Sequence, residues 1–206
     1  MDELLEESEG LHSEFSRIFE YGPADDSKRI TSSWIMCLIA QEHASSLRQL
    51  VMCGNYTSAI CIKRSQFESF TRAVWLFYAA TEEKVENTFS TLSELSQTAD
   101  QKPSNAEMIK ALEGKAPDEA VKMLNEFRDV QWKGLNSYVH GGIHALQRHG
   151  SGYPIQLIEQ IIKSSNGLLT MTAMMTAILT GNDAISKDIT RIQSRHRDCL
   201  PDLLPH

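Results

Sequence analysis

The sequence predicts an all-α protein, a single-domain bundle of about six to eight helices with long antiparallel helices at its centre and no β-sheet. Three observations predict this fold. Apolar residues recur at spacings of three and four through most of the chain, as on one face of a helix. No convincing run of alternating polar and apolar residues is present, so no strand is expected. Finally, 206 residues, of which 41% are hydrophobic and 23% charged, suit one domain with its own core.

Residues 1–26 form the first predicted unit, an acidic helix followed by a turn. Leucine, isoleucine and phenylalanine side chains share one face of this helix, and the opposite face is acidic. The unit holds nine acidic residues and one base, Arg17, so its net charge is −8. Because the whole chain has a net charge of −7, the other 180 residues together have a net charge of +1. The acidic face is either an ordinary solvated face or an arm that binds a partner. Whether the helix packs on its own domain or on a second molecule stays open.

Residues 27–199 form the predicted bundle domain. The helix expected over 56–81 is apolar on nearly all sides and should be central. Gly54 and Asn55 should end the helix before it, and Ser104 with Glu107 fits a capping box that opens a later one. Between them, the polar stretch 96–106 is predicted to be a flexible loop, and the tail 200–206 should be loose. Further helices are expected over 27–53, 81–95, 105–112, 117–128, 129–147, 154–180 and 183–199.

Composition excludes several classes of function. An acidic total argues against a surface that coats DNA. The most apolar run, 167–180, is shorter than the ~20 residues that span a bilayer, and the N-terminal residues are acidic where a secretory signal is basic. We therefore expect no membrane partner and a cytoplasmic location. The four cysteines form no C-x-x-C pair, which favours reduced core thiols.

Three charged residues lie four apart in the central helix: Arg64, Glu68 and Arg72. At 3.6 residues per turn they share one face, where Glu68 can pair with both arginines. The apolar residues around them suggest partial burial. One carboxylate between two guanidiniums leaves a net positive centre, which suits a phosphate or a carboxylate.

A second segment, residues 136–144, is expected to face this row. Asn136, His140 and His144 are four apart, so they share a face if the helix continues through Gly141 and Gly142. If the helix breaks there, His140 stands at its end and the glycines allow another backbone or a ligand to approach. The tyrosine of this segment is Tyr138. His140 is either a core histidine with satisfied hydrogen bonds or an acid, base or phosphate ligand.

Metal and cofactor chemistry is not indicated. The segment H-G-G-I-H lacks the glutamate of H-E-x-x-H, and no third metal ligand stands out. Neither a glycine-rich phosphate loop nor a G-x-S-x-G serine motif occurs. We expect no metal and no cofactor.

The chain resembles a group of uncharacterised bacterial helical proteins that are classed as domains of unknown function. The resemblance covers about residues 30–148 and is carried by the run 50–60, by the row Arg64-x3-Glu68-x3-Arg72-x2-Trp75-Leu76, and by Tyr138-Val-His-Gly-Gly142. Such proteins look like distant relatives of the HEPN superfamily. That resemblance implies a helical bundle, frequent homodimers and, in some members, metal-independent RNase activity in toxin–antitoxin or phage-defence systems.

The nuclease motif of HEPN proteins is Arg-x(4–6)-His, and this sequence departs from it. The permitted positions before His140 hold Lys133, Gly134 and Leu135. A literal match lies elsewhere, at Arg191 and His196, in a helix that is expected to be exposed.

Two functions remain. The first is a self-associating helical module, a homodimer, that is non-catalytic or senses a ligand, in a defence or toxin–antitoxin setting. The second is a metal-independent RNase in which His140 is the general acid or base and Arg64 or Arg72 holds a phosphate of RNA or of a nucleotide. A solvent-reachable cleft that holds His140 and the arginines would favour the RNase. A sealed cluster in which every polar group has a hydrogen-bond partner would favour the non-catalytic module.

Overall fold

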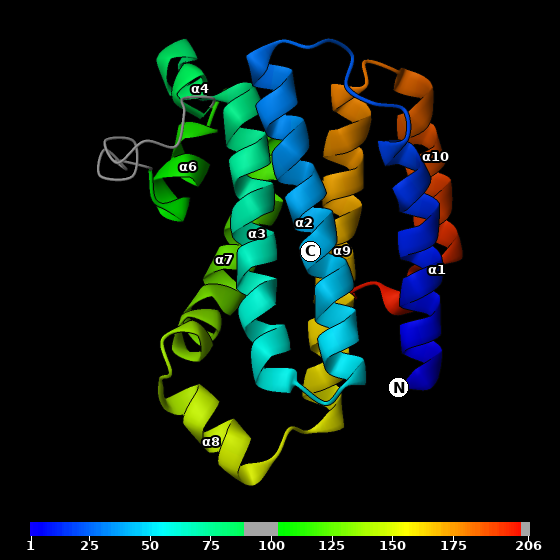
Figure 1. The fold of residues 1–206 in the computed structure, drawn as a ribbon, viewed down its shortest axis with the longest axis vertical. Coiled ribbons are helices and arrows are strands. Elements are labelled where there is room, and N and C mark those ends of the chain that lie inside the picture. The colour runs from blue at the N-terminus through cyan, green and yellow to red at the C-terminus, as the bar shows by residue number, and fades with distance from the viewer. Residues whose placement is uncertain (89–102, 203–206) are drawn as a thin grey trace.

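The structure is a computed structural model, which describes residues 1–88 and 103–202. These residues form a bundle of nine α-helices and one short 3-10 helix, and they contain no strand, so the predicted all-α class is confirmed (Figure 1). The helices are α1 (Asp2–Phe19), α2 (Lys28–Met52), α3 (Tyr56–Tyr78), α4 (Glu82–Thr88), α6 (Asn105–Ala111), α7 (Asp118–Val139), α8 (Ile143–Ser151), α9 (Ile155–Leu179), α10 (Asp183–Arg195) and the 3-10 helix η1 (Arg197–Cys199).

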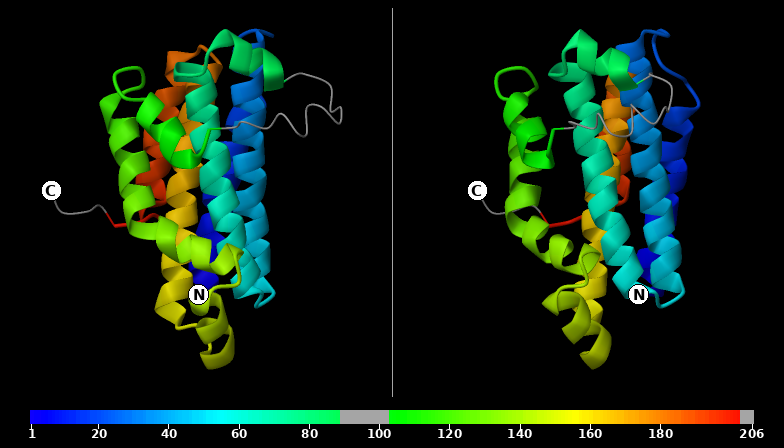
Figure 2. Two further views of the ribbon diagram at one scale, coloured as in Figure 1. Left: turned by 90° about the vertical axis from the view of Figure 1, so that its left-hand side faces the viewer. Right: turned by 60° about the vertical axis from the view of Figure 1, so that its left-hand side comes forward.

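The long helices α2, α3 and α9 run side by side through the middle of the molecule (Figures 1 and 2). Gly54 turns the chain between α2 and α3 with φ +74°, and the amide of Asn55 donates to the carbonyl of Leu50, as the predicted helix end requires. At the other end of this hairpin, Arg29 of α2 donates to the carbonyls of Leu76 and Ala80. That arginine therefore satisfies carbonyls that the end of α3 leaves free.

The core surrounds α3, as its apolar sequence predicts. Phe67, Phe70 and Trp75 are buried there against side chains from α2, α6, α7 and α9. On α7, the ring of Phe127 stacks on Phe67 at 4.2 Å between centroids. Burial of each such aromatic side chain contributes about 1.5–3 kcal/mol to the stability of the fold, so the packing of these side chains holds α3 in the bundle.

The acidic helix α1 packs on its own bundle, which answers the question that the sequence left open. Leu11 and Phe15 are fully buried against Ile185 and Ile189 of α10 and against apolar residues of α9. Most acidic side chains of α1, such as Glu6, point outward and are exposed.

Helix ends follow local sequence signals. Ser104 accepts from the amide of Glu107, whose carboxylate accepts from the amide of Ser104, so the predicted capping box is present. Of the predicted flexible loop 96–106, residues 96–102 lie outside the described residues. At the start of the tail Pro201 lies against α9, because a Cβ at Gly167 would lie 3.0 Å from it. Residues 203–206 lie outside the description.

Two of the four thiols have the predicted core position. Cys37 and Cys199 are buried, Cys61 is half-buried and Cys53 is exposed. Burial raises the pKa of Cys37 to about 12 and that of Cys199 to about 11. The two buried thiols are therefore unreactive core groups.

Candidate functional site

Arg64 of α3 is the centre of a small polar cluster on the face that α3 shares with α7. Its Nη2 and Nε atoms donate to one carboxylate oxygen of Glu68 at 3.1 and 3.3 Å, one helical turn away. The Arg64 side chain is 17% exposed and that of Glu68 39%. The predicted pair between these two residues is therefore present and lies at the edge of solvent.

Trp132 of α7 and His140, which follows that helix, complete this group, which we call the Arg64 cluster: Arg64, Glu68, Trp132 and His140. The guanidinium carbon lies 4.7 Å from the Trp132 ring centroid, a distance at which a cation is attracted to the ring face. Nη1 of Arg64 lies 3.3 Å from Nε2 of His140. Because arginine can only donate, the Nε2 lone pair of His140 accepts this bond and the ring keeps Nδ1 for other partners.

A helix break at the glycine pair places His140. Helix α7 ends at Val139, and His140 follows as its cap, exposed to solvent. Gly141 has φ +62°, a conformation that favours glycine. A Cβ at Gly142 would lie only 2.6 Å from Oγ of Ser137, so this position requires a close backbone approach. Of the two expected arrangements, the structure has the broken helix.

The break removes His144 from the expected row. His144 belongs to α8, its side chain is exposed, and its backbone amide donates to Oγ of Ser137 at 3.1 Å. Asn136, His140 and His144 therefore do not share one helical face. Asn136 is half-buried, and within the described residues its Oδ1 has no hydrogen-bond partner.

The two remaining predicted site residues lie outside the Arg64 cluster. Arg72 is half-buried, and among the described residues Glu68 pairs with Arg64 and not with Arg72. Tyr138 is half-buried beside the start of α9, and burial, followed by the nearby Tyr153, raises the pKa of its hydroxyl. Of the two pairs that the spacing allows Glu68 to form, the described residues contain the one with Arg64.

A buried cation that the sequence did not indicate lies beside this cluster. Lys63 is 3% exposed, lies 5.6 Å from the Phe127 ring centroid, and donates to Oε1 of Gln131. Gln131 in turn bonds to Ser164 of α9 at 2.9 Å. Burial lowers the pKa of Lys63 to about 7. Lys63 is followed directly by Arg64, and two adjacent bases are typical of a helix surface, so only the burial of its helix on all sides could have indicated this.

The literal Arg-x4-His match has a structural role. His196 follows α10, and its two ring nitrogens lie 3.0 Å from carboxylate oxygens of Glu7 and Glu14 of α1. Gly10 makes room for the ring, since a Cβ there would lie 3.1 Å from its Cε1. Arg191 is exposed and pairs with Asp188 at 2.9 Å. His196 thus joins the end of α10 to α1. The expectation that the segment with this match is exposed holds for Arg191 but not for His196.

A second network that the sequence did not indicate joins α1 to α2. Arg48 is 3% exposed and donates to the Glu9 carboxylate, with Nη2 at 3.1 Å, and to His12. Burial, with Arg48 as a smaller cause, lowers the pKa of His12 to about 4. Gln41 extends the network to Ser16 at 2.8 Å.

Within residues 1–88 and 103–202, no group of three or more histidine, cysteine, aspartate or glutamate side chains is placed to hold a metal ion. Among the helices of the same ranges, none is long and apolar enough to cross a membrane.

The fold and the cluster define a class: an all-helical bundle with an arginine–histidine contact at the surface between two of its helices. The model of a family of unknown function, DUF6988, matches residues 37–202, and the chain belongs to that family. The match begins inside α2, so α1 lies before it. Neither a curated protein nor a solved structure matches the chain.

Proposed function

We propose that this protein is a non-catalytic, ligand-sensing helical module whose Arg64 cluster binds a phosphate- or carboxylate-bearing ligand. One observation carries the proposal: a guanidinium held by Trp132 and Glu68 contacts an exposed histidine across two helices. Arginine presents a planar fork of donors that suits both kinds of anion. Arginine has five N–H donors, and His140 keeps Nδ1 beside its Nε2 contact, so donors remain for such an anion.

The occupied nitrogen of His140 favours binding over catalysis. A general base needs a free lone pair within reach of the proton that it removes. Here Nε2 accepts from Arg64, so the base of the RNase alternative is already engaged. In addition, no contact within the described residues brings Arg72 to His140 as a second phosphate holder.

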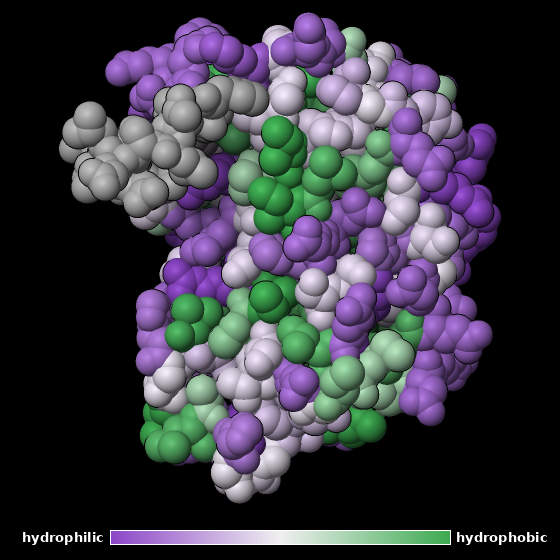
Figure 3. Space-filling view, in the orientation of Figure 1, coloured by the Kyte–Doolittle hydropathy of each residue, from purple (hydrophilic) through white to green (hydrophobic). Residues whose placement is uncertain are grey.

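We further propose self-association as a homodimer through α7 and α8. Val139, Ile143 and Leu146 flank His140 and are exposed, with Leu146 at 69%. Figure 3 shows apolar surface at the corner of the molecule where α8 lies in Figure 1. A second copy that covers these side chains would gain about 25 cal/mol per Å² of apolar surface removed from water.

The setting of this function rests on the sequence resemblance. We propose a bacterial, cytoplasmic, HEPN-like module that works in a defence or toxin–antitoxin pair, with RNA or a nucleotide phosphate as the source of its anion. The metal-independent RNase remains the alternative that the experiment below separates from it.

Ligand binding is tested by thermal unfolding with inorganic phosphate, a nucleoside monophosphate and citrate, each up to 100 times its dissociation constant. Binding to the folded state then adds about 2.7 kcal/mol to the free energy of unfolding and raises the melting temperature of wild type. The rise should vanish in Arg64→Leu and persist in Arg197→Leu, a matched loss of an exposed arginine on η1. A rise that survives in Arg64→Leu contradicts the proposed site.

Wild type and His140→Ala, each incubated with RNA, test the alternative. Intact RNA with wild type is expected. Cleavage by wild type that is lost in His140→Ala, at an unchanged melting temperature, contradicts the non-catalytic proposal and establishes the RNase.

Self-association is tested by sedimentation of Leu146→Glu and of Ile35→Glu, which places the same charge on an exposed isoleucine of α2. We expect the first to yield monomers and the second to leave the dimer intact. The reverse result would assign the interface to α2.

A further inference from the structure

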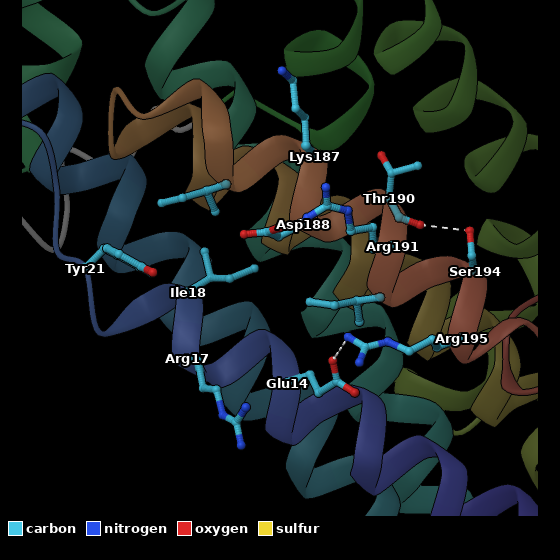
Figure 4. A pocket seen from close by; sticks show the side chains of 12 residues that line it. Glu14, Arg17, Ile18, Tyr21, Lys187, Asp188, Thr190, Arg191, Ser194 and Arg195 are labelled. Carbon is cyan, nitrogen blue, oxygen red and sulfur yellow. Dashed lines mark hydrogen bonds and ion pairs between the residues drawn. The ribbon is translucent and has the colours of Figure 1, made fainter.

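A hollow lies between α1 and α10, but its apolar floor belongs to the core. Ile18, Ile185 and Ile192, which line it, are only 4–7% exposed. Figure 4 shows Glu14 and Arg195 bonded to each other beside it. Polar side chains that face one another at the edge of solvent lie instead between α3 and α8, on the side of the bundle opposite to α1 (Figure 1).

A second polar group follows the Arg64 cluster along α3, nearer the start of that helix. Oγ1 of Thr57 lies 2.7 Å from Oη of Tyr153 and 3.3 Å from Nδ1 of His149. We call Thr57, His149 and Tyr153 the Thr57 group. Thr57 precedes Arg64 by seven residues, or about two helical turns, so the two lie on the same side of α3 and ~10 Å apart along its axis.

The Thr57 group keeps a hydrogen-bond donor for a ligand. A neutral histidine has one N–H, and threonine and tyrosine have one O–H each, so the three side chains hold three donors. The two contacts of Thr57 use two of these donors. One donor is therefore left in every arrangement of the hydrogens, on His149, on Thr57 or on Tyr153. His149 is exposed and the other two are half-buried, so this donor lies at the edge of solvent.

Arg148 adds a positive charge beside this group. Ala145 is the buried residue of α8, and Arg148 and His149 follow it by three and four residues, so both share the face of α8 that is turned toward the bundle. Arg148 is exposed, and within the described residues its side chain has no ion pair or hydrogen bond. Leu146 of the proposed dimer surface lies on another face of α8, so the two surfaces do not compete.

Tyr138 and Cys61 lie between the two groups. Burial is the main cause that raises the pKa of the Tyr138 hydroxyl, and smaller effects come from Tyr153, Arg148 and Cys61 nearby. Burial also raises the pKa of the Cys61 thiol, and the neighbouring Arg64 lowers it by a smaller amount. The strip along α3 thus has an arginine and a histidine at each end and uncharged polar groups in its middle.

The two segments that form this strip are positive, whereas the whole chain is acidic. Residues 53–81 and 130–158 hold one acidic residue, Glu68, and four bases besides the buried Lys63, which leaves +3 in a protein of net charge −7. The four bases are Arg64, Arg72, Lys133 and Arg148. An excess of positive charge in one region of an acidic protein attracts anions to that region.

We propose that the anion site extends from the Arg64 cluster to the Thr57 group, and that its ligand is a small molecule with a phosphate at each end of an uncharged, hydroxyl-bearing spacer. One phosphate binds Arg64 and His140, and the other binds Arg148 and the Thr57 group. Each end offers donors from several side chains, which suits the three oxygens of a phosphate. One phosphate cannot contact both ends, because they are ~10 Å apart along α3. The inference rests on the proposed binding of an anion at Arg64.

The test compares fructose 1,6-bisphosphate, fructose 6-phosphate and inorganic triphosphate by isothermal titration calorimetry at constant ionic strength. Wild type should bind the bisphosphate at least ~10-fold more tightly than the monophosphate, because the second end adds contacts within one ligand. Triphosphate, which has high charge without the spacer, should bind more weakly than the bisphosphate.

Variants assign the second phosphate to its end of the strip. Arg148→Gln should remove most of the gain and weaken monophosphate binding much less, and His149→Gln should remove part of the gain. Arg197→Gln, the loss of an exposed arginine on η1, should bind all three ligands as wild type does. Arg64→Leu should weaken the binding of both sugar phosphates. Melting temperatures equal to that of wild type check that each variant is folded.

Three results overturn the extension alone. They are equal affinities of wild type for the two sugar phosphates, a gain as large in Arg148→Gln as in wild type, and tighter binding of triphosphate than of the bisphosphate. Each leaves the proposed site at Arg64 standing if Arg64→Leu still weakens monophosphate binding. No binding by wild type, or binding that is unchanged in Arg64→Leu, overturns the Arg64 site together with its extension.

Discussion

Two buried cations of this bundle have opposite surroundings. Arg48, between α1 and α2, and Lys63, between α3 and α7, are each 3% exposed. Arg48 meets a carboxylate, Glu9, whereas Lys63 meets the neutral side chain of Gln131 and the ring of Phe127. The α1 side of the molecule therefore neutralises its buried charge, and the α3–α7 side leaves it uncompensated next to Arg64.

The same contrast holds for the histidines of the two sides. His196 is held between two carboxylates, whereas His140 is exposed and contacts a cation. Clusters whose charges are matched internally fasten helices together. The Arg64 cluster instead keeps a histidine exposed beside its arginine, and this difference is the basis of the proposed function.

The largest expected effect is on the neutralised side. Arg48→Met removes the donors to Glu9, to His12 and to the carbonyl of Ala44, which lies 3.3 Å from Nη1. We expect the free energy of unfolding to fall by about 3 kcal/mol, because the partly buried acceptors lose a charged donor. Urea unfolding at neutral pH measures it. A change in the free energy of unfolding below ~0.5 kcal/mol would contradict the proposed difference between the surroundings of Arg48 and Lys63.

The opposite sign is expected for Lys63→Met. Replacing an unneutralised buried charge by an apolar side chain of similar length should raise the free energy of unfolding by about 2 kcal/mol at pH 6. In wild type the pKa of Lys63 is about 7 in the folded state against 10.5 in the unfolded chain. The unfolded chain thus binds more protons between these values, so wild-type stability rises with pH across that range.

The gain from Lys63→Met should accordingly shrink as the pH is raised from 6 to 10. Gln131→Leu in the wild-type background is the control for the lost hydrogen bond. A gain that is constant with pH would show that the lysine is not the titrating group.

A smaller loss of stability is expected at His196, which joins the end of α10 to α1. His196→Ala removes two bonds to carboxylates that are themselves partly solvated, so the loss should be about 1 kcal/mol. Hydrogen exchange should rise in α1 and stay unchanged in α7. Faster exchange in α7 instead would contradict the independence of the two sides.

The smallest pair of effects separates the two arginines of α3. Arg64→Ala loses the Glu68 pair and the contact with Trp132, for about 1 kcal/mol. Arg72→Ala loses no ion pair with Glu68 and should stay within ~0.5 kcal/mol. Equal losses of stability in the two variants would indicate that Glu68 pairs with both arginines, as their spacing in the sequence allows.

Much of the fold could be predicted because its signals are local. The capping box at Ser104, the turn at Gly54 and the apolar surface of α3 each depend on residues a few positions apart. The family model confirms the resemblance to a group of unknown function.

The site could be predicted only in part, because its decisive contacts join distant segments. That Arg64 can reach Glu68 follows from helical spacing, but its turn toward His140, 76 residues away, depends on how α7 packs. Two possibilities at Gly141 were open, and the close approach of Gly142 to Ser137 decides between them. Lys63 was missed for the same reason, since burial by α7 and α9 has no local signal.

The most direct test of the central claim is an NMR titration with inorganic phosphate that follows the Arg64 Nε–H signal and the ring signals of His140 and His196. The account predicts that Arg64 and His140 shift together and saturate, while His196, which two carboxylates hold, stays in place. Unchanged Arg64 and His140 signals, or a shift of His196 alone, would contradict it.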